Sequence, residues 1–362
     1  MKRLITALAL LLAVVFFKAG HWAMLLAIIA LIIAHEFGHW VVARALGIAV
    51  PVFSIGFGRS PRIRLGNFWG TEFQLTPWLF GGYVKINPAD ESFCKEAAWK
   101  RGAVLVAGVA MNMLAALIIM FGLYVTYGQP HFVPKALVVT EVSSPVVGGS
   151  DSLIKVGDLI VSIDGRPVKT AADFVAGISG HKDGSAAQLV LNRAGANVTA
   201  TIVPDSQGRV GINARVLGDV VYKQMNLFDA GWQSVDFTYH MSKEMFVGLG
   251  MMAHIVPPPP GLPDGATDVH GLVAIVQLGA TAFSDSLYTF MRMVALISLN
   301  LAVLNILPIP VLDGGHLGFL TCEALTGKRV SVGVQERINM LFIGLLMLLM
   351  LFGLFNDIFK PV

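Results

Sequence analysis

The residues best suited to chemistry are His35, Glu36 and His39, which stand in the pattern His-Glu-Phe-Gly-His. This pattern lies within an apolar run, Trp22 to Leu46, whose length and composition predict a helix. Residues four apart share one face of a helix, so both imidazoles can bind one metal ion. Zinc lowers the pKa of a bound water to about 7, and a neighbouring glutamate can accept the proton. The pattern therefore indicates metal-assisted hydrolysis of a peptide bond.

A chance match to this pattern on the surface of a soluble helix is the simplest alternative. Here, however, two histidines and a glutamate lie in a segment long enough to cross a membrane. Ionisable groups at that depth are costly unless they are paired or bound to metal. The setting therefore favours a metal site.

A catalytic zinc site needs a third protein ligand and one position left for water. Asp313 is the only carboxylate at the end of the fourth apolar run, in the stretch NILPIPVLDGGH. Pro308 and Pro310 break the helix ahead of it, and the freed backbone groups require a protein-buried or watery cavity. His316 is the competing ligand, but it lies one turn further toward the polar side, where a supporting role fits better. We predict that Asp313 is the third ligand.

The elements that must position these residues are membrane helices. The chain has 362 residues, of which 55% are hydrophobic and 14% charged, and one soluble core cannot bury that much apolar surface. A membrane-crossing helix needs roughly 20 residues, so the middle three of the apolar segments qualify outright and the first and last are short. The apolar segments are Leu4 to Phe17, Trp22 to Leu46, Ala103 to Tyr124, Leu287 to Val311 and Met340 to Phe355.

The first apolar segment follows two basic residues and is similar to a signal-peptide core, but no small-residue cleavage site follows it. We predict that residues 4–17 are retained, as a short span or as the lead-in to the first helix. The net charge of +3 is spread thinly and gives no indication of nucleic acid binding. Basic residues gather between Gly47 and Arg101 and again after Asp313, which places both connections in the cytosol and residues 128 to 286 on the other side.

Short β-rich segments follow the first long span, at Val52 to Phe57, Thr71 to Leu75 and Gly82 to Ile86. They predict a small sheet or β-loop close to the membrane surface. From Ala136 to Ala214 the composition becomes that of a soluble domain, with a capped helix candidate at Thr170 to Ile178. The strand candidates of this domain are ALVVTEV, DLIVSIDG, AQLVLNR and NVTATIV.

The predicted fold class is an α-helical integral membrane protein with about four transmembrane helices, a membrane-associated β-loop and one small α+β domain. Asn226 to Ile255 mixes apolar and charged positions, which predicts an amphipathic helix at the interface, and PPPPGLPDG after it is a stiff connector. The predicted parts are an N-terminal membrane region at residues 1–127, the extracytoplasmic domain at 128–225, the helix and connector at 226–286, and a C-terminal membrane region at 287–362.

On these motifs the sequence resembles the site-2 protease family, and within it the bacterial regulator-of-sigma-E proteases. The resemblance rests on HEFGH, on NILPIPVLDGGH, on a single soluble insert, and on the stretches FSIGFGRS, GTEFQL, GGYVKI, ALISLNL and LFND. It implies that His35, His39 and Asp313 bind Zn²⁺ and that Glu36 is the general base.

The resemblance also implies residues that hold substrate. Asn112 and Asn305 would position it, whereas the residues alone fit interhelical hydrogen bonds equally well. Gly82 and Tyr83 would belong to a β-loop whose edge pairs with an unwound substrate. The insert resembles a PDZ domain through KVGDLIVSIDG at residues 155–165, and such domains can bind an extended peptide as an added strand. A glycine-rich carboxylate-binding turn is not evident, so a size filter is an equal alternative.

The leading hypothesis is a zinc metalloprotease of the bacterial inner membrane that cuts single-span membrane proteins within the lipid bilayer, in regulated intramembrane proteolysis. The resemblance implies anti-sigma factors and remnant signal peptides as substrates. The alternative is a non-catalytic membrane adaptor that captures partners through its PDZ-like domain, and a fourth ligand such as His316 or Cys322 would favour that structural metal. A transporter is a third reading, although the inverted repeats of many transporters are absent from the sequence.

Overall fold

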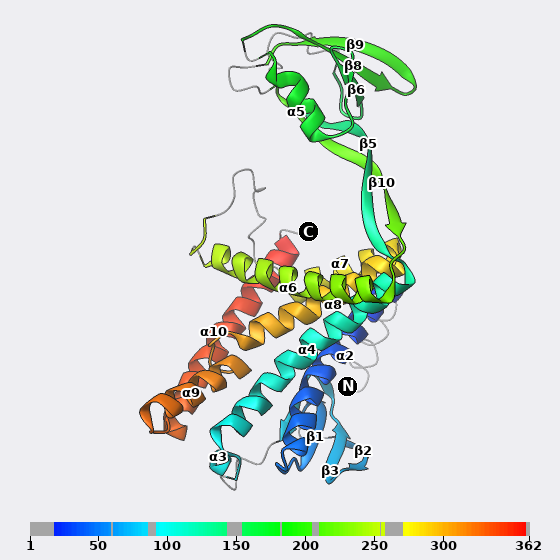
Figure 1. Ribbon diagram of the computed structural model, residues 1–362. Helices are drawn as coiled ribbons and strands as arrows, with labels where there is room; N and C mark the ends of the chain where they lie inside the picture. The colour runs from blue at the N-terminus through cyan, green and yellow to red at the C-terminus, as the bar shows by residue number, and fades with distance from the viewer. Residues whose placement is uncertain are drawn as a thin grey trace, which may run out of the picture. The chain divides into compact units, whose positions relative to one another are not determined.

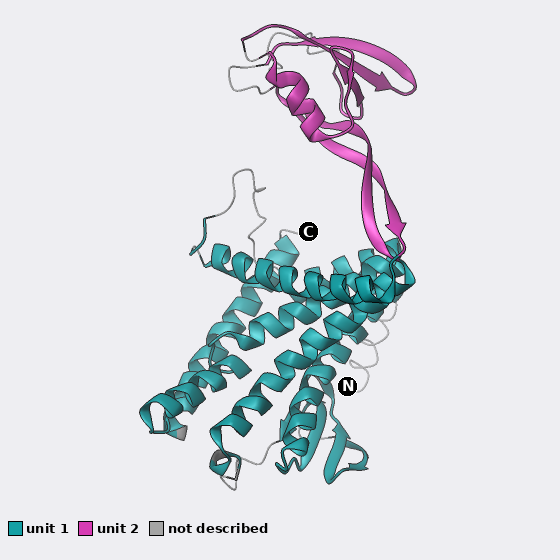
Figure 2. Ribbon diagram, in the orientation of Figure 1, with its two compact units in different colours: residues 1–127, 225–362 teal, residues 128–224 magenta. Residues whose placement is uncertain are grey.

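The computed structural model describes residues 18–58, 61–85, 92–142, 154–181, 183–204, 210–253, 255–257 and 271–359. The chain divides into two compact units (Figure 2). We call residues 1–127 together with 225–362 the membrane unit, and residues 128–224 the insert. The proposed short span at residues 4–17 lies outside the described residues.

Among the described residues, the membrane unit has four helices that are long and apolar enough to cross a membrane, which confirms the expected fold class at this level. α4 is central among them, because it packs against α2, α8 and two further helices, α6 and α9 (Figure 1). The four candidate spans are α2 (Ala19–Ala45), α4 (Ala98–Thr126), α8 (Leu287–Ile306) and α10 (Val332–Phe359).

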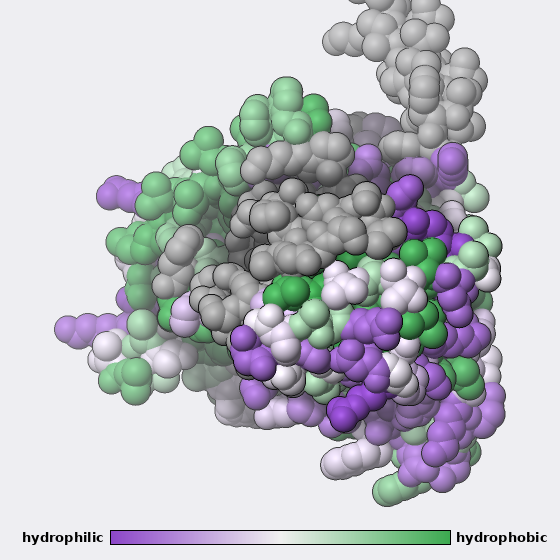
Figure 3. Space-filling model, turned by 90° about the horizontal axis from the view of Figure 1, so that it is seen from above, coloured by the Kyte–Doolittle hydropathy of each residue, from purple (hydrophilic) through white to green (hydrophobic). Residues whose placement is uncertain are grey.

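The outer surface of these spans is apolar, as a lipid-facing surface must be. Along α10 nearly every leucine, methionine and phenylalanine between Met340 and Phe359 is exposed. Figure 3 shows hydrophobic side chains, coloured green, gathered along part of the visible surface. The chain is thus a multi-pass membrane protein.

Shorter helices complete the membrane unit: α3 (Ser92–Lys95), α6 (Leu227–Met252), α7 (Leu272–Asp285) and α9 (Asp313–Thr326). α6 is the helix expected after the insert, and Asn226 caps its first turn by accepting from Asp229 N–H. A residue of α10, remote in sequence, caps the start of α7: the Asp357 carboxylate accepts from Gly271 N–H at 2.7 Å and from Ala274 N–H at 3.1 Å. The terminal stretch LFND therefore ties the last helix to α7.

A four-stranded sheet packs against the end of α2 that carries His39. Its order is β2-β3-β1-β4, with β1 parallel to β3 and antiparallel to β4, so β4 is an edge strand. The Trp40 indole donates to Thr71 Oγ1 at 2.9 Å, and a buried cluster that includes Trp40, Phe53 and Val104 joins the sheet to α2 and α4. The strands are β1 (Val52–Phe57), β2 (Ile63–Phe68), β3 (Thr71–Leu75) and β4 (Trp78–Lys85).

The sequence predicted β1 and β3 with their observed bounds, and β4 begins four residues before the predicted Gly82. β2 was missed: all six of its residues are exposed, and the alternation of Ile63, Arg64 and Leu65 ends at Gly66 and Asn67.

The insert is a six-stranded antiparallel arrangement with one helix and its own buried core. Its path is β10-β5-β6-β8-β9, with β7 paired to β6. Thr170 caps α5 in a capping box with Asp173, as the helix candidate predicted. The elements are β5 (Gln129–Val142), β6 (Leu159–Ile163), β7 (Arg166–Pro167), α5 (Ala171–Ser179), β8 (Ala187–Arg193), β9 (Ala196–Ile202) and β10 (Ile212–Lys223).

Candidate metal centre

Three metal-binding side chains from two helices meet inside the membrane unit. His35 and His39 lie one turn apart on α2, and Asp313 is the first residue of α9. The Asp313 Oδ2 atom lies 3.0 Å from His35 Nε2 and 3.3 Å from His39 Nε2. The two Nε2 atoms are 3.2 Å apart. Both imidazoles are buried, so the cluster is shielded from bulk water.

The spacing of these three atoms fits zinc. In a tetrahedral site with bonds of about 2.0–2.1 Å, neighbouring ligand atoms lie about 3.3 Å apart. The observed separations of 3.0, 3.2 and 3.3 Å match that geometry. Asp313 Oδ2 is buried and forms no hydrogen bond with the described part of the chain, so it is an acceptor that lacks a donor. Two imidazoles and one carboxylate are a donor set typical of catalytic zinc.

The close approach of α4 to α2 depends on glycines. A Cβ atom on Gly38 would lie 2.4 Å from the Ala107 carbonyl oxygen, so the glycine of His-Glu-Phe-Gly-His is the point where α2 crosses α4. A Cβ atom on Gly108 would lie 2.4 Å from His39 Nε2 and 2.6 Å from His35 Cε1. The bare backbone of Gly108 therefore forms one wall of the metal site.

α4 also orients both imidazoles. His39 Nδ1 lies 2.7 Å from the Val104 carbonyl oxygen, an acceptor that requires the proton on Nδ1 and leaves Nε2 free for metal. Asn112 is fully buried, and its amide lies 3.3 Å from His35 Nδ1. In the structure Nδ2 faces the ring and Oδ1 has no donor among the described residues, but amide oxygen and nitrogen are assigned from their partners and can be exchanged. With the oxygen toward the ring, Asn112 accepts from Nδ1–H and leaves the His35 Nε2 lone pair for metal.

Glu36 stands between the histidines and the edge of the sheet. Its Oε2 atom accepts from the Val84 backbone N–H at 3.1 Å. A Cβ atom on Gly82 would lie 3.2 Å from Glu36 Cγ and 3.0 Å from the Ser54 carbonyl oxygen. The missing side chain at Gly82 thus lets the edge strand β4 approach the carboxylate.

Asp313 is held by a tight turn between α8 and α9. Val311 adopts φ +91°, a conformation that β-branched residues very rarely take. Gly314 and Gly315 follow, and a Cβ atom on either would lie within 2.4 Å of a backbone oxygen of the preceding turn. Strain of this kind persists only where the surrounding structure enforces it, and it often marks functional sites.

The remaining predicted residues lie around this centre. The Tyr83 side chain packs on Phe57 and accepts from the Gln74 amide, so its backbone rather than its ring faces the edge of β4. Asn305 is half-buried near the end of α8, and no hydrogen bond from the described residues engages it. His316 lies outside the cluster of metal-binding atoms, on the next turn of α9. Contact of Asn112, Asn305, Gly82 or Tyr83 with substrate stays a prediction.

Sequence reasoning missed four contributors to the site: Val84, Val104, Gly108 and Val311. Gly108 could have been found, because it precedes Asn112 by one helical turn and small residues mark close helix crossings in membranes. Val84 and Val104 act through backbone groups, which any residue type carries. The unusual φ of Val311 has no signature in its residue type.

A multi-pass helical protein whose helices bring two histidines, a carboxylate and a neighbouring glutamate together is a membrane zinc metalloprotease. Comparison with known proteins agrees, since the model of peptidase family M50 matches residues 23–351. The chain belongs to peptidase family M50, the site-2 protease family.

Individual relatives are similar over most of the chain. The candidate zinc metalloprotease Cj1068 of Campylobacter jejuni is 29% identical in an alignment of 378 positions, gaps included. The alignment covers 99% of this chain and 98% of the relative. The candidate zinc metalloprotease CPE1693 of Clostridium perfringens is 30% identical, with 93% of this chain and 98% of the relative covered. Zinc metalloprotease RasP of Geobacillus kaustophilus is 27% identical over 280 residues, which cover 76% of this chain and 63% of the relative.

Proposed function

We propose that this metalloprotease hydrolyses peptide bonds within or near the transmembrane segments of single-span proteins, with His35, His39 and Asp313 as zinc ligands and Glu36 as the general base. The observation that carries the proposal is the convergence of three ligand atoms within 3.3 Å of one another, two of them from α2, a candidate membrane span, and one from α9. A water-filled or protein-buried site is needed there, because exposed peptide groups are not tolerated in lipid.

The chemistry follows from the arrangement. When bound, zinc acts as a Lewis acid toward water and the peptide carbonyl. The Val84 N–H engages Oε2 of Glu36 and fixes its carboxylate, so Oε1 is available to accept the proton of the attacking water. The same carboxyl group then delivers this proton to the leaving amine. Val104 and Asn112 hold the two imidazoles in the orientation that directs Nε2 at the metal.

Substrate would bind as an added strand on β4. β4 is an edge strand, and backbone groups two residues apart point to the same side, so Gly82 presents its backbone on the side where Val84 meets Glu36. A transmembrane helix must unwind to be cut, and pairing with β4 satisfies the backbone groups that unwinding exposes. Asn305, whose amide has no partner in the described structure, is available to contact the unwound chain.

The insert and the orientation belong to the same proposal. The insert is PDZ-like, and it would select or exclude substrates on the extracytoplasmic side. The metal centre would lie toward the cytosol, supported by the basic residues that follow β1 and α9. Anti-sigma factors and remnant signal peptides of a bacterial inner membrane are the substrate classes that fit a single span.

The decisive experiment compares purified wild-type protein with Glu36→Gln in detergent, using a model single-span substrate with and without a chelator. Wild type should cleave, and chelation should stop it. Glu36→Gln should keep one zinc per chain while its cleavage rate falls by about 100-fold or more, because a general base contributes that much.

Glu141→Gln is the matched control, since Glu141 is an exposed carboxylate of the insert that accepts a hydrogen bond from the Asn213 amide. It should leave both zinc content and cleavage unchanged. Cleavage by Glu36→Gln at a near wild-type rate would contradict the proposed mechanism. The adaptor hypothesis needs a fourth metal ligand, and none joins His35, His39 and Asp313 among the described residues. Cys322 is exposed and lies outside this group.

A further inference from the structure

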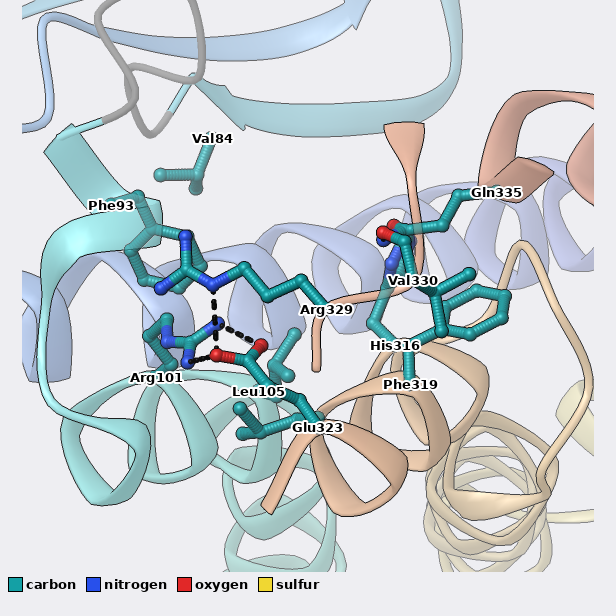
Figure 4. A pocket seen from close by; sticks show the side chains of 11 residues that line it. Val84, Phe93, Arg101, Leu105, His316, Phe319, Glu323, Arg329, Val330 and Gln335 are labelled. Atoms are coloured by element: carbon teal, nitrogen blue, oxygen red, sulfur yellow. Dashed lines mark hydrogen bonds and ion pairs between the residues drawn. The ribbon is translucent and has the colours of Figure 1, made fainter. Parts of the chain in front are cut away.

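A pocket of about 340 Å³ lies in the membrane unit beside the metal centre, and no part of the mechanism above uses it (Figure 4). It is formed by segments far apart in sequence: β4, α3, the start of α4, α9, and the connection from α9 to α10. The lining is mostly apolar. The apolar members are Val84, Phe93, Leu105, Phe319, Leu320 and Val330.

Three lining residues lie on elements that also contact the metal centre, through the same residue or through a near neighbour in the chain. Val84 donates its N–H to Glu36. Leu105 follows Val104, whose carbonyl oxygen meets His39 Nδ1 at 2.7 Å. His316 lies three residues after Asp313, on the neighbouring turn of α9. Three different elements thus each contribute one contact to the metal centre and one wall to the pocket, so the two spaces adjoin.

The base of the pocket is closed by an ion-pair cluster. Arg101 donates two hydrogen bonds to Glu323, at 2.7 and 3.0 Å, and Arg329 donates a third at 2.8 Å (Figure 4). Hydrogen bonds from Arg101 and then from Arg329 lower the pKa of Glu323 to about 2, so the carboxylate is ionised throughout the physiological range. The cluster ties α4 to α9 and to the loop that follows α9.

The loop that forms the outer wall is held in place without a ligand. Gln335 of α10 donates to the Val330 carbonyl oxygen at 2.8 Å, and Gly327 ends α9 in the left-handed conformation at φ +68°. A cavity with fixed walls does not need to be ordered when it is filled, so its shape can discriminate between occupants.

We propose that this pocket receives a large apolar side chain of the substrate, from a residue close to the bond that is cut, and that it sets sequence preference. This inference rests on the proposed function. A chain paired with β4 passes Glu36 at Val84 and then meets the pocket, which also has Val84 in its wall. Leucine, methionine or phenylalanine suits the apolar lining, while the charges of Arg101 and Glu323 satisfy each other.

The test uses a series of single-span substrates in which each position within four residues of the cleaved bond is alanine or phenylalanine. Wild type should prefer phenylalanine at one position by about tenfold or more in kcat/KM, the scale of discrimination that an apolar pocket supplies. Leu105→Trp, which fills the pocket from α4, should reduce this phenylalanine-to-alanine ratio by about tenfold. Val330→Trp fills it from the opposite wall and should act in the same direction.

Leu114→Trp is the matched control, because Leu114 is on the same helix with its side chain exposed on the surface. It should leave the phenylalanine-to-alanine ratio unchanged. Zinc content is measured for every variant, because a misfolded protein should lose zinc whereas a protein with a filled pocket should keep it. A ratio unchanged in both filled variants, or a wild type that prefers phenylalanine at none of these positions, would overturn the pocket assignment while wild-type cleavage stands. If wild type cleaves no substrate of the series, the proposed function fails as well.

Discussion

Gly108 is the residue on which the approach of α4 to the histidine pair depends. Its hydrogen atom occupies space in which a methyl group would lie 2.4 Å from His39 Nε2 and 2.7 Å from His35 Nε2. Neither imidazole can move away freely, because Val104 and Asn112 hold the opposite nitrogens. The metal site therefore requires a glycine at position 108 of α4, in addition to the metal-binding side chains themselves.

Gly108→Ala should lower zinc affinity by at least about tenfold and reduce cleavage in parallel, since the new methyl group displaces the ligand atoms. Zinc content after dialysis against a graded series of chelator concentrations measures this. Gly122→Ala is the control on the same helix, because a Cβ atom there meets nothing within 4 Å. It should bind zinc normally, and equal loss of zinc in both variants would show that α4 does not approach the site as described.

At this scale the sequence predicted that His35, His39 and Asp313 lie together, and the structure groups their ligand atoms, since helical spacing alone brings His35 and His39 together. The role of Glu36 as general base stays a prediction. Asp313 followed from its being the only carboxylate in its run. Asn112 was predicted to contact substrate, and its burial beside His35 supports a role in orienting the ring. The Val311 turn could not be predicted, because its conformation is imposed by the packing around it.

The strands illustrate what periodicity can and cannot reveal. β8 buries alternate residues against the core of the insert, and β9 does so toward its end; the sequence predicted both strands, and also β1, β3 and β6. β2 is fully exposed, and β10 alternates partly buried and exposed residues only over its first eight positions before it continues exposed in its pairing with β5; neither strand was predicted. Strands stabilised by pairing alone leave little trace in residue type.

In the insert, the loop before β6 is fastened to β8 by a buried carboxylate. Asp158 is almost fully buried and receives two hydrogen bonds from Arg193, both at 2.7 Å, and one from the Lys155 backbone N–H at 2.8 Å. The hydrogen bonds from Arg193 hold the pKa of Asp158 below its ordinary value. The stretch KVGDLIVSIDG thus includes a residue whose role here is to fix the fold.

Asp158→Asn should lower the free energy of unfolding of isolated residues 128–224 by about 2 kcal/mol at pH 7. The native carboxylate has the lowered pKa, so its contribution is complete above the unfolded value near 4 and is lost as the pH falls through the folded value. Urea unfolding at pH 7, 4 and 2.5 should therefore show wild type and variant converging in acid. A difference that is constant with pH would exclude the ionised pair as its source.

The whole molecule consists of two units that the chain connects twice, between residues 127 and 128 and between residues 224 and 225. β5 begins the insert and β10 ends it, and the two strands pair from Gln129 with Lys223 up to Val142 with Ile212. The chain therefore enters and leaves the insert at one place, where paired Cα atoms are about 5 Å apart. Each unit has a separate buried core.

Removal of residues 128–224, with Tyr127 joined to Met225 through a short glycine-serine linker, should leave a membrane unit that binds one zinc per chain. Every metal ligand and every lining residue of the pocket belongs to that unit. Zinc analysis and thermal unfolding in detergent test this against the full chain. Failure to bind zinc would mean that the insert is required to fold the membrane unit.

The tie between Asp357 and the start of α7 bears on how the protein is made. The α7 N–H groups at Gly271 and Ala274 find their acceptor on a residue up to 86 positions later in the chain. During synthesis α7 is therefore made well before the Asp357 carboxylate that accepts from its first turn, and Asp313 is also made late. A chain that ends before residue 313 lacks one of the three grouped metal-binding side chains, so we expect such an unfinished chain to bind no zinc at this centre.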